Sequence, residues 1–489
     1  MIFFKGQKEF LSKLEHSIGQ HRCVTHFRVI PLLNIIDLNR GNKTFKNQTN
    51  MKKLLPMFTI LFCANAFAQK DNLQTKAIAA AATIEQKVIN WRRDFHANPE
   101  LGNREFRTAE IVAKHLTSLG IEVKTGVAKT GVVGILKGGL PGPVIALRAD
   151  MDALPITERV NIPFASKVKT TYNGNETGVM HACGHDAHTA MLMGVAEVLA
   201  GMKKDLRGTV KFIFQPAEEG SPVGEEGGAK LMVKEAVMEN PHVDVVFGIH
   251  VSAEMPAGQI GYRPAGFMAA VSDMKIIVNG LGSHGASPWM SVDPIVTSAQ
   301  IINNLQTIVS RNLRLTDNAA VLTIGAINGG NRSNIIPEKI EMLGTVRTFS
   351  DADEKLFYEK IKLIVTKTAE SNGATAEVII PYSSKYPVTF NDPALVQKML
   401  PSLQKTVGVN NAILVSAKTG SEDFSFYQQK APGFFFNLGS MPPNAKPTSH
   451  HTPDFFLDES SFKLGVNAFT NLVLDYMDMN PGNTFKKVK

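Results

Sequence analysis

Residues 132–147 read VVGILKGGLPGPVIAL and contain two short apolar runs, at 132–136 and 144–147. The same alternation continues along the chain, with apolar runs at 210–214 and 243–249 and helical patterns at 189–202 and 227–237. Apolar runs that alternate with helices predict a mostly parallel sheet whose two faces are covered by helices. We therefore expect an α/β fold.

A different order of elements begins after Pro264. The pattern predicts strand, helix, strand, strand, helix, strand at 274–278, 294–312, 320–327, 339–348, 352–371 and 374–380. This order is the ferredoxin-like unit, which closes as a small domain by itself. The α/β pattern returns after Pro387. We predict one larger domain, formed by residues 69–265 and 386–489, that is interrupted by an inserted domain at 266–385.

The composition is that of a globular protein of two or three domains. The chain has 489 residues, of which 44% are hydrophobic and 20% are charged. The net charge is +8, but residues 1–53 hold ten Lys and Arg against three Asp and Glu. The rest of the chain is nearly balanced, so its charge argues against a nucleic-acid partner.

Residues 51–68 have the pattern of a secretory signal peptide. Met51 and two lysines precede an apolar core at 54–63, and small residues with the A-x-A spacing end at Ala68. A membrane-spanning helix needs about twice this apolar length, so we expect cleavage after Ala68 with no membrane anchor left. The predicted location is the periplasm or the exterior. Residues 1–50 are interpreted as an upstream mis-assigned start, with a genuine extension as the alternative.

Cys183 is the one cysteine after residue 68, so the processed chain forms no internal disulfide. It lies in the run HACGHDAH, residues 181–188, beside three histidines. Cys183 and His185 would point to different sides of a helix, but to one side of an extended turn before a helix. Thiolate and imidazole suit zinc and related divalent metals. A cluster of polar turn residues and a Cys183 nucleophile with a histidine base are the alternatives.

Carboxylates and histidines also stand where predicted strands end. Glu218 and Glu219 follow the strand that ends at Phe214, and neighbours at such a position point in different directions. One of them can bind a metal while the other acts as a general base, although a solvated loop is the alternative. Three further residues have the same placement: His250, His451 and Asp152. Ligands of open α/β sheets gather at the carboxyl ends of strands, so we expect these side chains to meet.

Seven motifs together resemble the amidohydrolase branch of the two-metal aminoacylase and carboxypeptidase clan. This branch includes hippurate hydrolases, N-acetyl amino acid deacetylases and auxin-conjugate hydrolases. The motifs are, in chain order, RADMDALP from Arg148, HACGHD from His181, QPAEEG from Gln215, GIH from Gly248, SHGASP from Ser283, TGSEDF from Thr419 and HTP from His451. The resemblance covers roughly residues 84–476. It implies a catalytic α/β domain and an inserted domain that serves as a lid and often dimerises.

The resemblance also implies two divalent metal ions, zinc or manganese, bound by Cys183, His185, Glu219, His250 and His451. Cys183 would bridge the two sites, with His185 and His250 at one and Glu219 and His451 at the other. Glu218 would be the general base and acid, and Asp152 would orient a metal-binding imidazole.

Three residues of the inserted domain complete the implied site. His284, between Gly282 and Gly285, would donate a hydrogen bond to the oxyanion, which requires closure within one chain or across a homodimer. Asn334 and Arg347 would bind the substrate carboxylate. A turn histidine and a surface cation are the alternatives for His284 and Arg347.

We therefore predict an exported metal-dependent amidohydrolase that cleaves N-acyl amino acids or small peptides by metal-activated water. A secreted metallo-dipeptidase or carboxypeptidase is the main alternative, since an acyl-amino acid and a dipeptide differ by an amine. A Cys183 thiol hydrolase and a non-enzymatic metal-binding module are also retained. Glu218 argues against the binding module, because a pure binder has no use for a base beside its ligand.

Overall fold

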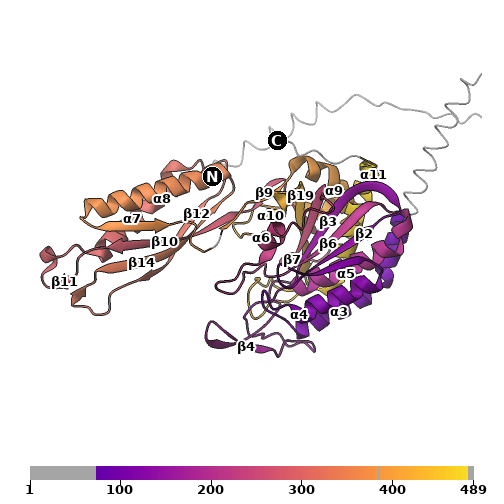
Figure 1. The fold of residues 1–489 in the computed structure, drawn as a ribbon, viewed down its shortest axis with the longest axis horizontal. Coiled ribbons are helices and arrows are strands. Elements are labelled where there is room, and N and C mark those ends of the chain that lie inside the picture. Colours follow the sequence, from indigo (N-terminus) through magenta and orange to yellow (C-terminus); the bar gives the residue numbers. More distant parts are fainter. Residues whose placement is uncertain (1–72, 384, 483–489) are drawn as a thin grey trace, which may run out of the picture. The chain divides into compact units, whose positions relative to one another are not determined.

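The apolar runs form the centre of an eight-stranded sheet in a computed structural model that describes residues 73–383 and 385–482 (Figure 1). The four central strands run parallel in the order β6 (Arg207–Gln215), β3 (Leu140–Asp150), β7 (Val245–Pro256) and β19 (Gly433–Met441). The outer strands are β1 (Glu122–Val127), β2 (Gly131–Lys137), β8 (Ile260–Tyr262) and β18 (Ala412–Leu414). Because β2 pairs antiparallel with β6, and β8 with β19, the sheet is parallel at its centre and mixed at its edges.

Helices cover both faces of this sheet. One face packs on α3 (Glu85–Ala97), α4 (Phe106–Ser118), α5 (His185–Gly201), α9 (Pro393–Val407) and α11 (Phe462–Met479). The other face packs on the shorter helices α6 (Gly228–Lys234) and α10 (Ser425–Gln428). Successive residues of β7 face opposite cores, since Val245 and Phe247 belong to the first and Val246 to the second. A strand buried on both faces has to be apolar at every position, which explains the continuous runs in the sequence.

The inserted domain is an antiparallel sheet with two helices. Its elements are, in chain order, β10 (Ala270–Asn279), α7 (Pro294–Thr307), β12 (Val321–Asn328), β14 (Lys339–Thr348), α8 (Asp351–Ser371) and β15 (Thr375–Ile379). The strands lie in the order β12-β14-β10-β15, and side chains of both helices enter the core of this domain. The predicted fold class, an α/β domain interrupted by a ferredoxin-like unit, is confirmed.

Short elements complete the fold. The remaining strands are β4 (Lys169–Tyr172), β5 (Asn175–Gly178), β9 (Ala265–Met268), β11 (Ser283–His284), β13 (Ile335–Ile336), β16 (Lys385–Tyr386) and β17 (Thr389–Asn391). The short helical turns are η2 (Lys203–Asp205), η3 (Pro288–Met290), η4 (Ile308–Asn312), η5 (Val409–Asn411) and η6 (Glu459–Ser461). The strands β11 and β13 pair with each other, as do β9 and β17.

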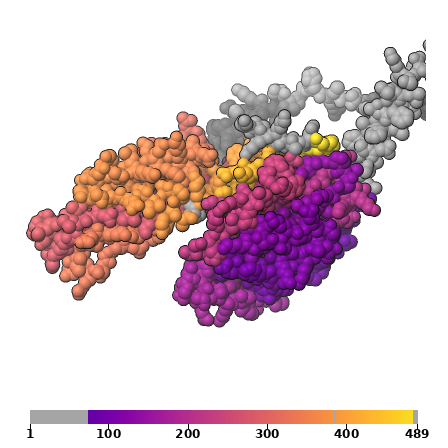
Figure 2. All heavy atoms as spheres, in the orientation of Figure 1, coloured from indigo at the N-terminus to yellow at the C-terminus, as the bar shows by residue number. Residues whose placement is uncertain are grey.

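The larger domain is assembled from two separated parts of the chain. Strand β19 lies between β7 and β8, and α11 contacts α3 and α5. Figure 2 shows the yellow C-terminal residues against the indigo and magenta N-terminal ones. All described residues belong to one compact unit, 64–489. The exact domain boundaries stay predictions.

The predicted signal peptide at 51–68 and residues 1–50 lie outside the described residues. None of the helices in the described part of the chain is long and apolar enough to cross a membrane.

Candidate metal centre

The predicted ligands lie near the carboxyl ends of the central strands or at the start of α5. Cys183 lies in the turn before α5, and Gly184 has φ 99°. A side chain at Gly184 would meet Val251, because a Cβ placed there lies 2.2 Å from its Cγ2. Glycine is therefore required for the turn that places Cys183 and His185 on one side.

One expected strand boundary is wrong. The strand predicted to end at Ile249 continues as β7 to Pro256, so His250 lies inside the strand. The parallel pairing of β3 with β7 nevertheless ends at Arg148 and Gly248, which leaves His250 just beyond the paired region. Asp152 likewise lies two residues after the end of β3. Both side chains thus lie just beyond the carboxyl end of the β3–β7 pairing, although β7 still pairs with β19 at His250.

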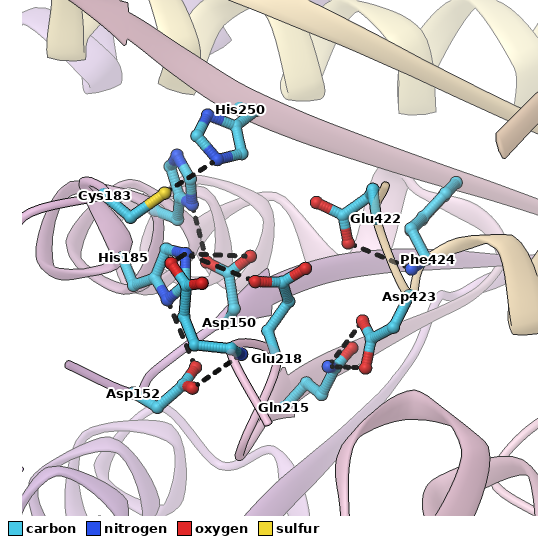
Figure 3. Close-up of polar contacts among 12 residues, drawn as sticks. Asp150, Asp152, Cys183, His185, Gln215, Glu218, His250, Glu422, Asp423 and Phe424 are labelled. Atoms are coloured by element: carbon cyan, nitrogen blue, oxygen red, sulfur yellow. Dashed lines mark hydrogen bonds and ion pairs between the residues drawn. The ribbon is translucent and has the colours of Figure 1, made fainter. Parts of the chain in front are cut away.

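Five side chains meet at this edge of the sheet, and Figure 3 labels three of them, Cys183, His185 and His250. Cys183 Sγ lies 3.3 Å from His250 Nε2 and 3.3 Å from His451 Nε2. Glu219 Oε1 lies 2.9 Å from His451 Nε2 and 3.9 Å from His185 Nε2. The ligand atoms form two groups, each within 4.8 Å: Cys183 with His185 and His250, and Cys183 with Glu219 and His451. Because Cys183 belongs to both groups, it can bridge two ions.

Hydrogen bonds hold these ligands in place. The Asp152 carboxylate accepts from His185 Nδ1 at 3.1 Å and from the Glu219 backbone N–H at 2.9 Å. One carboxylate therefore orients one ligand from each group. His250 donates from Nδ1 to the Val251 carbonyl at 2.6 Å, so its Nε2 stays free of a proton and faces Cys183. Such partners fix the tautomer of a metal-binding histidine.

The chemistry of the cluster fits divalent cations. Nε2 of His185 is buried and has no hydrogen-bond partner in the described residues. Burial alone would lower the pKa of His185, but Asp150, Asp152 and Glu219 raise it to about 10. The surrounding carboxylates thus favour positive charge at His185 Nε2, where a metal cation can bind in place of a proton. Thiolate, imidazole and carboxylate are the ligands that zinc and related metals prefer.

Cys183 is poorly placed to act as a nucleophile by itself. Burial raises its pKa well above the usual range, and Glu219, Glu218 and Asp150 raise it further. A nucleophilic cysteine needs the opposite surroundings, because cations or a helix N-terminus must favour its thiolate. The acidic surroundings therefore favour the role of metal ligand, since a bound cation reverses the local electrostatics.

Glu218 lies beside the cluster but is oriented differently from Glu219. Its side chain is buried, and Oε2 lies 3.9 Å from His185 Nε2. Burial raises the pKa of Glu218 well above its usual value, and the nearby Glu422 and Glu219 add to this. A carboxyl group with a raised pKa can both accept and return a proton near neutral pH.

A buried network of charges lies behind Glu218. The guanidinium of Arg148 is fully buried and forms ion pairs with Asp150, Glu422 and Asp423. Gln215 donates from Nε2 to both carboxylate oxygens of Asp423 at 2.8 Å (Figure 3). We assigned no role to these residues from the sequence, although they lie in three of the quoted motifs. The network holds the ends of β3 and β6 against the segment before α10.

Four of the five predicted metal ligands, Cys183, Glu219, His250 and His451, line a cleft of about 520 Å³ that residues of both domains form. Besides these ligands, its walls include Glu218 and Lys418 of the larger domain, Arg347 of the inserted domain, and Tyr386 of β16, which pairs with β10 of the inserted sheet. Arg347 lies on β14 and donates from Nη1 to Ser421 Oγ at 3.1 Å. The structure thus brings Arg347 to the cleft. No pattern in the sequence had indicated that Tyr386 or Lys418 would belong to the site.

His284 and Asn334 lie elsewhere in the inserted domain. Strands β11 and β13 place them together, and Gly285 N–H donates to the Asn334 carbonyl at 2.9 Å. Neither residue lines the cleft, and both side chains are exposed. Asp273, near the start of β10, lines the cleft. Strand β11 follows the other end of β10, and that end lies about 20 Å along the strand from Asp273. Figure 1 shows β11 at that end of the inserted sheet.

Comparisons with known proteins agree with this site. The model of "Peptidase family M20/M25/M40" matches residues 146–475. Thermostable carboxypeptidase 2 of Saccharolobus solfataricus is 40% identical over 80% of this chain and 96% of its own length. N-acetylcysteine deacetylase of Bacillus subtilis is 38% identical over 81% of this chain and 98% of its own length. The crystal structure of the YXEP protein of Bacillus subtilis, described as a dinuclear metal binding peptidase, has a TM-score of 0.67 at 34% identity and covers 80% of this chain and 98% of that one.

Proposed function

The chain belongs to peptidase family M20/M25/M40 and is a metal-dependent hydrolase that acts on amides, and we propose that its substrates are N-acyl amino acids. The observation that carries this proposal is the arrangement of one cleft. There, Glu218 lies beside the two groups of predicted metal ligands, and Arg347 forms no ion pair with any carboxylate among the described residues, although the charge of Asp273 acts on it. An N-acyl amino acid has one amide to cleave and one carboxylate to bind.

The residues of the chain divide the work as follows. The five ligands would hold two divalent cations, which would supply Lewis-acid activation of the amide carbonyl and of water. Glu218 accepts the proton of the attacking water and returns it to the leaving amine, as its raised pKa allows. Arg347 binds the carboxylate of the amino acid and thereby fixes the amide relative to Glu218. Asp152 keeps His185 and Glu219 in position during this cycle.

We also propose that the active form is a homodimer. Asp273 lines the cleft, whereas His284 follows the far end of β10, about 20 Å along the strand from Asp273, so we infer that closure of the inserted domain within one chain does not bring both to the cleft. A second copy of the chain can supply His284 instead. Its surroundings favour association, since Leu281, Trp289 and Met290 are 54%, 78% and 66% exposed. In this arrangement His284 would donate to the oxyanion, and the neighbouring Asn334 would help to bind the substrate.

Export and the choice of metal belong to the same proposal. The signal pattern at 51–68 supports a periplasmic or secreted enzyme. The mixed sulfur, nitrogen and oxygen ligands support zinc, with manganese as the other candidate.

A panel of substrates tests the proposed function. The protein from residue 69 onward would be loaded with zinc or manganese and given acetyl, benzoyl and indoleacetyl amino acids together with dipeptides. We expect hydrolysis of acyl amino acids with free carboxylates, and at least about a tenfold loss when that carboxylate is amidated. Turnover that does not depend on the carboxylate would contradict the proposal.

The same panel tests a peptidase function, which the 40% identity to a carboxypeptidase favours. A dipeptide brings a positively charged amine into the cleft, where Asp273 is available as its partner. Dipeptides that are cleaved faster than the matching acetyl amino acids would establish this second function.

A further inference from the structure

Lys418 is a second cation in the cleft that contains the metal ligands. Lys418 lies in the segment after β18, two positions before Gly420. Lys418 and Gly420 line the cleft together with Cys183, His250 and His450. None of the roles above uses Lys418. Its position is therefore open to another function.

The backbone holds Lys418 firmly in the wall of the cleft. Its N–H donates to the Phe267 carbonyl at 2.9 Å, and its carbonyl accepts from the Ala269 N–H at 3.0 Å. These two bonds make a parallel bridge between Lys418 and Met268. The side chain thus starts from a fixed point beside the end of β9, where the larger domain meets the inserted one.

The ammonium group of Lys418 has no partner among the residues that the structure describes. No carboxylate lies within 4.0 Å of Nζ, although Glu254 and the Cys183 sulfur are near enough to interact through their charges. The side chain is partly buried, and burial lowers the pKa of Lys418. A partly buried cation without a partner costs free energy unless a ligand supplies the negative charge.

Arg347 is another cation that lines the cleft and forms no ion pair within the described part of the chain, and its guanidinium contacts Ser421. A simple N-acyl amino acid carries one carboxylate, which Arg347 alone would bind. Such a substrate therefore leaves Lys418 without a carboxylate, although Asp273 also lines the cleft and its charge acts on Arg347. An additional anionic group on the substrate would satisfy the charge of Lys418.

We propose that Lys418 binds a second carboxylate of the substrate, so that this enzyme prefers amides with two anionic groups. The inference rests on the proposed function, in which Arg347 binds the first carboxylate. The second carboxylate has two possible sources with the same chemistry. It belongs either to an acidic amino-acid side chain or to a dicarboxylic acyl group.

Two pairs of compounds separate these sources. N-acetylglutamate and N-acetylglutamine differ in the charge of the side chain, and N-succinylmethionine and N-butanoylmethionine differ in the charge of the acyl group. The metal-loaded enzyme is expected to prefer the charged member of one pair by about 10- to 100-fold in kcat/KM, as for a hydrogen bond to a charged group. The pair that shows the preference identifies the source.

Three variants connect the preference to Lys418. Lys418→Met should abolish it, mainly by raising KM for the charged compound, because the interaction is already present in the bound substrate. Lys418→Arg should keep most of it. Lys430→Met, which removes an exposed lysine outside the cleft, should leave it unchanged.

Two results would overturn the inference while leaving the proposed function intact. One is equal kcat/KM for both members of both pairs, and the other is a preference that survives in Lys418→Met. If the enzyme hydrolyses none of the four compounds, the proposed function is overturned, and the inference is overturned with it.

Discussion

Replacement of Glu218 by glutamine separates catalysis from metal binding at a single atom. Glutamine keeps the size of the side chain and its place 3.9 Å from His185, but it cannot accept a proton. Because a positioned base contributes about 10² to 10⁴ in rate, and Glu218 also serves as the acid, we expect kcat to fall by at least about 10³. Glu218 also lies within reach of His185 and Glu219 in a group that could hold a metal, but it belongs to neither group that contains Cys183, so we expect the metal content to be unchanged.

Glu219→Gln is the matched control, because it is the same substitution at the neighbouring residue. Glu219 is in contact with His451 and lies in the group that contains Cys183, so this variant should lose metal. The assay measures bound metal by mass spectrometry and kcat under saturating substrate for both variants. Equal metal loss in the two variants, or a Glu218→Gln enzyme with kcat within tenfold of the parent, would refute the assignment.

The stability of the metal-free variant gives an independent check. The folded state raises the pKa of Glu218, so ionisation of this carboxyl group opposes folding as the pH rises above about 4.5. Glutamine removes that penalty. Metal-free Glu218→Gln should therefore be at least as stable as the metal-free parent at pH 8, and a large loss of stability would show that the side chain has a structural role instead.

Three further predictions concern the surroundings of the site. Asp152→Asn should weaken the binding of both ions by about 10- to 100-fold, because one carboxylate orients a ligand in each group; titration with a competing chelator measures this. Excess chelator should abolish turnover and added zinc or manganese should restore it, whereas full activity in chelator would favour the thiol hydrolase. His96→Asn should destabilise the metal-free protein more at pH 5.5 than at pH 9, as urea unfolding would show. Burial alone would lower the pKa of His96, but hydrogen bonds to Asp186 and Glu158 raise it above 6.5, so the stabilisation is complete at low pH and is lost as the pH rises through the raised value.

Periodicity predicted the fold class because each central strand is buried on both faces and each covering helix has one apolar face. It could not predict that β2 runs antiparallel to β6, since a short apolar run carries no information on direction. Likewise, the continuous apolar run at residues 243–249 predicted a strand that ends there, because the run stops at His250, whereas β7 continues to Pro256 through alternating apolar and polar residues.

Within the site, the sequence predicts chemistry carried by residues close together in the chain, but not contacts between residues far apart. Cys183 and His185 are two residues apart, so their chemistry is visible in the sequence. The ion pair between Arg148 and Asp423 joins residues 275 positions apart and depends on the whole sheet. That Lys418 forms no ion pair among the described residues is harder still to predict, because the sequence does not show which carboxylates lie near a given lysine in the fold.

The division of the larger domain into two segments has a consequence for the order in which the protein folds. A growing chain that has reached the end of β15 already contains Cys183, His185 and His250, but it lacks β19, α11 and His451. Strand β7 is then an exposed edge, and the apolar face of α5 is only partly covered. Native contacts that span most of the chain form late and slow the search for the final structure. The inserted domain can close before them, because all strands of its main sheet come from residues 270–386. The second group of ligands is completed only when the last fifth of the polypeptide docks, so an unfinished chain cannot assemble the pair of ions.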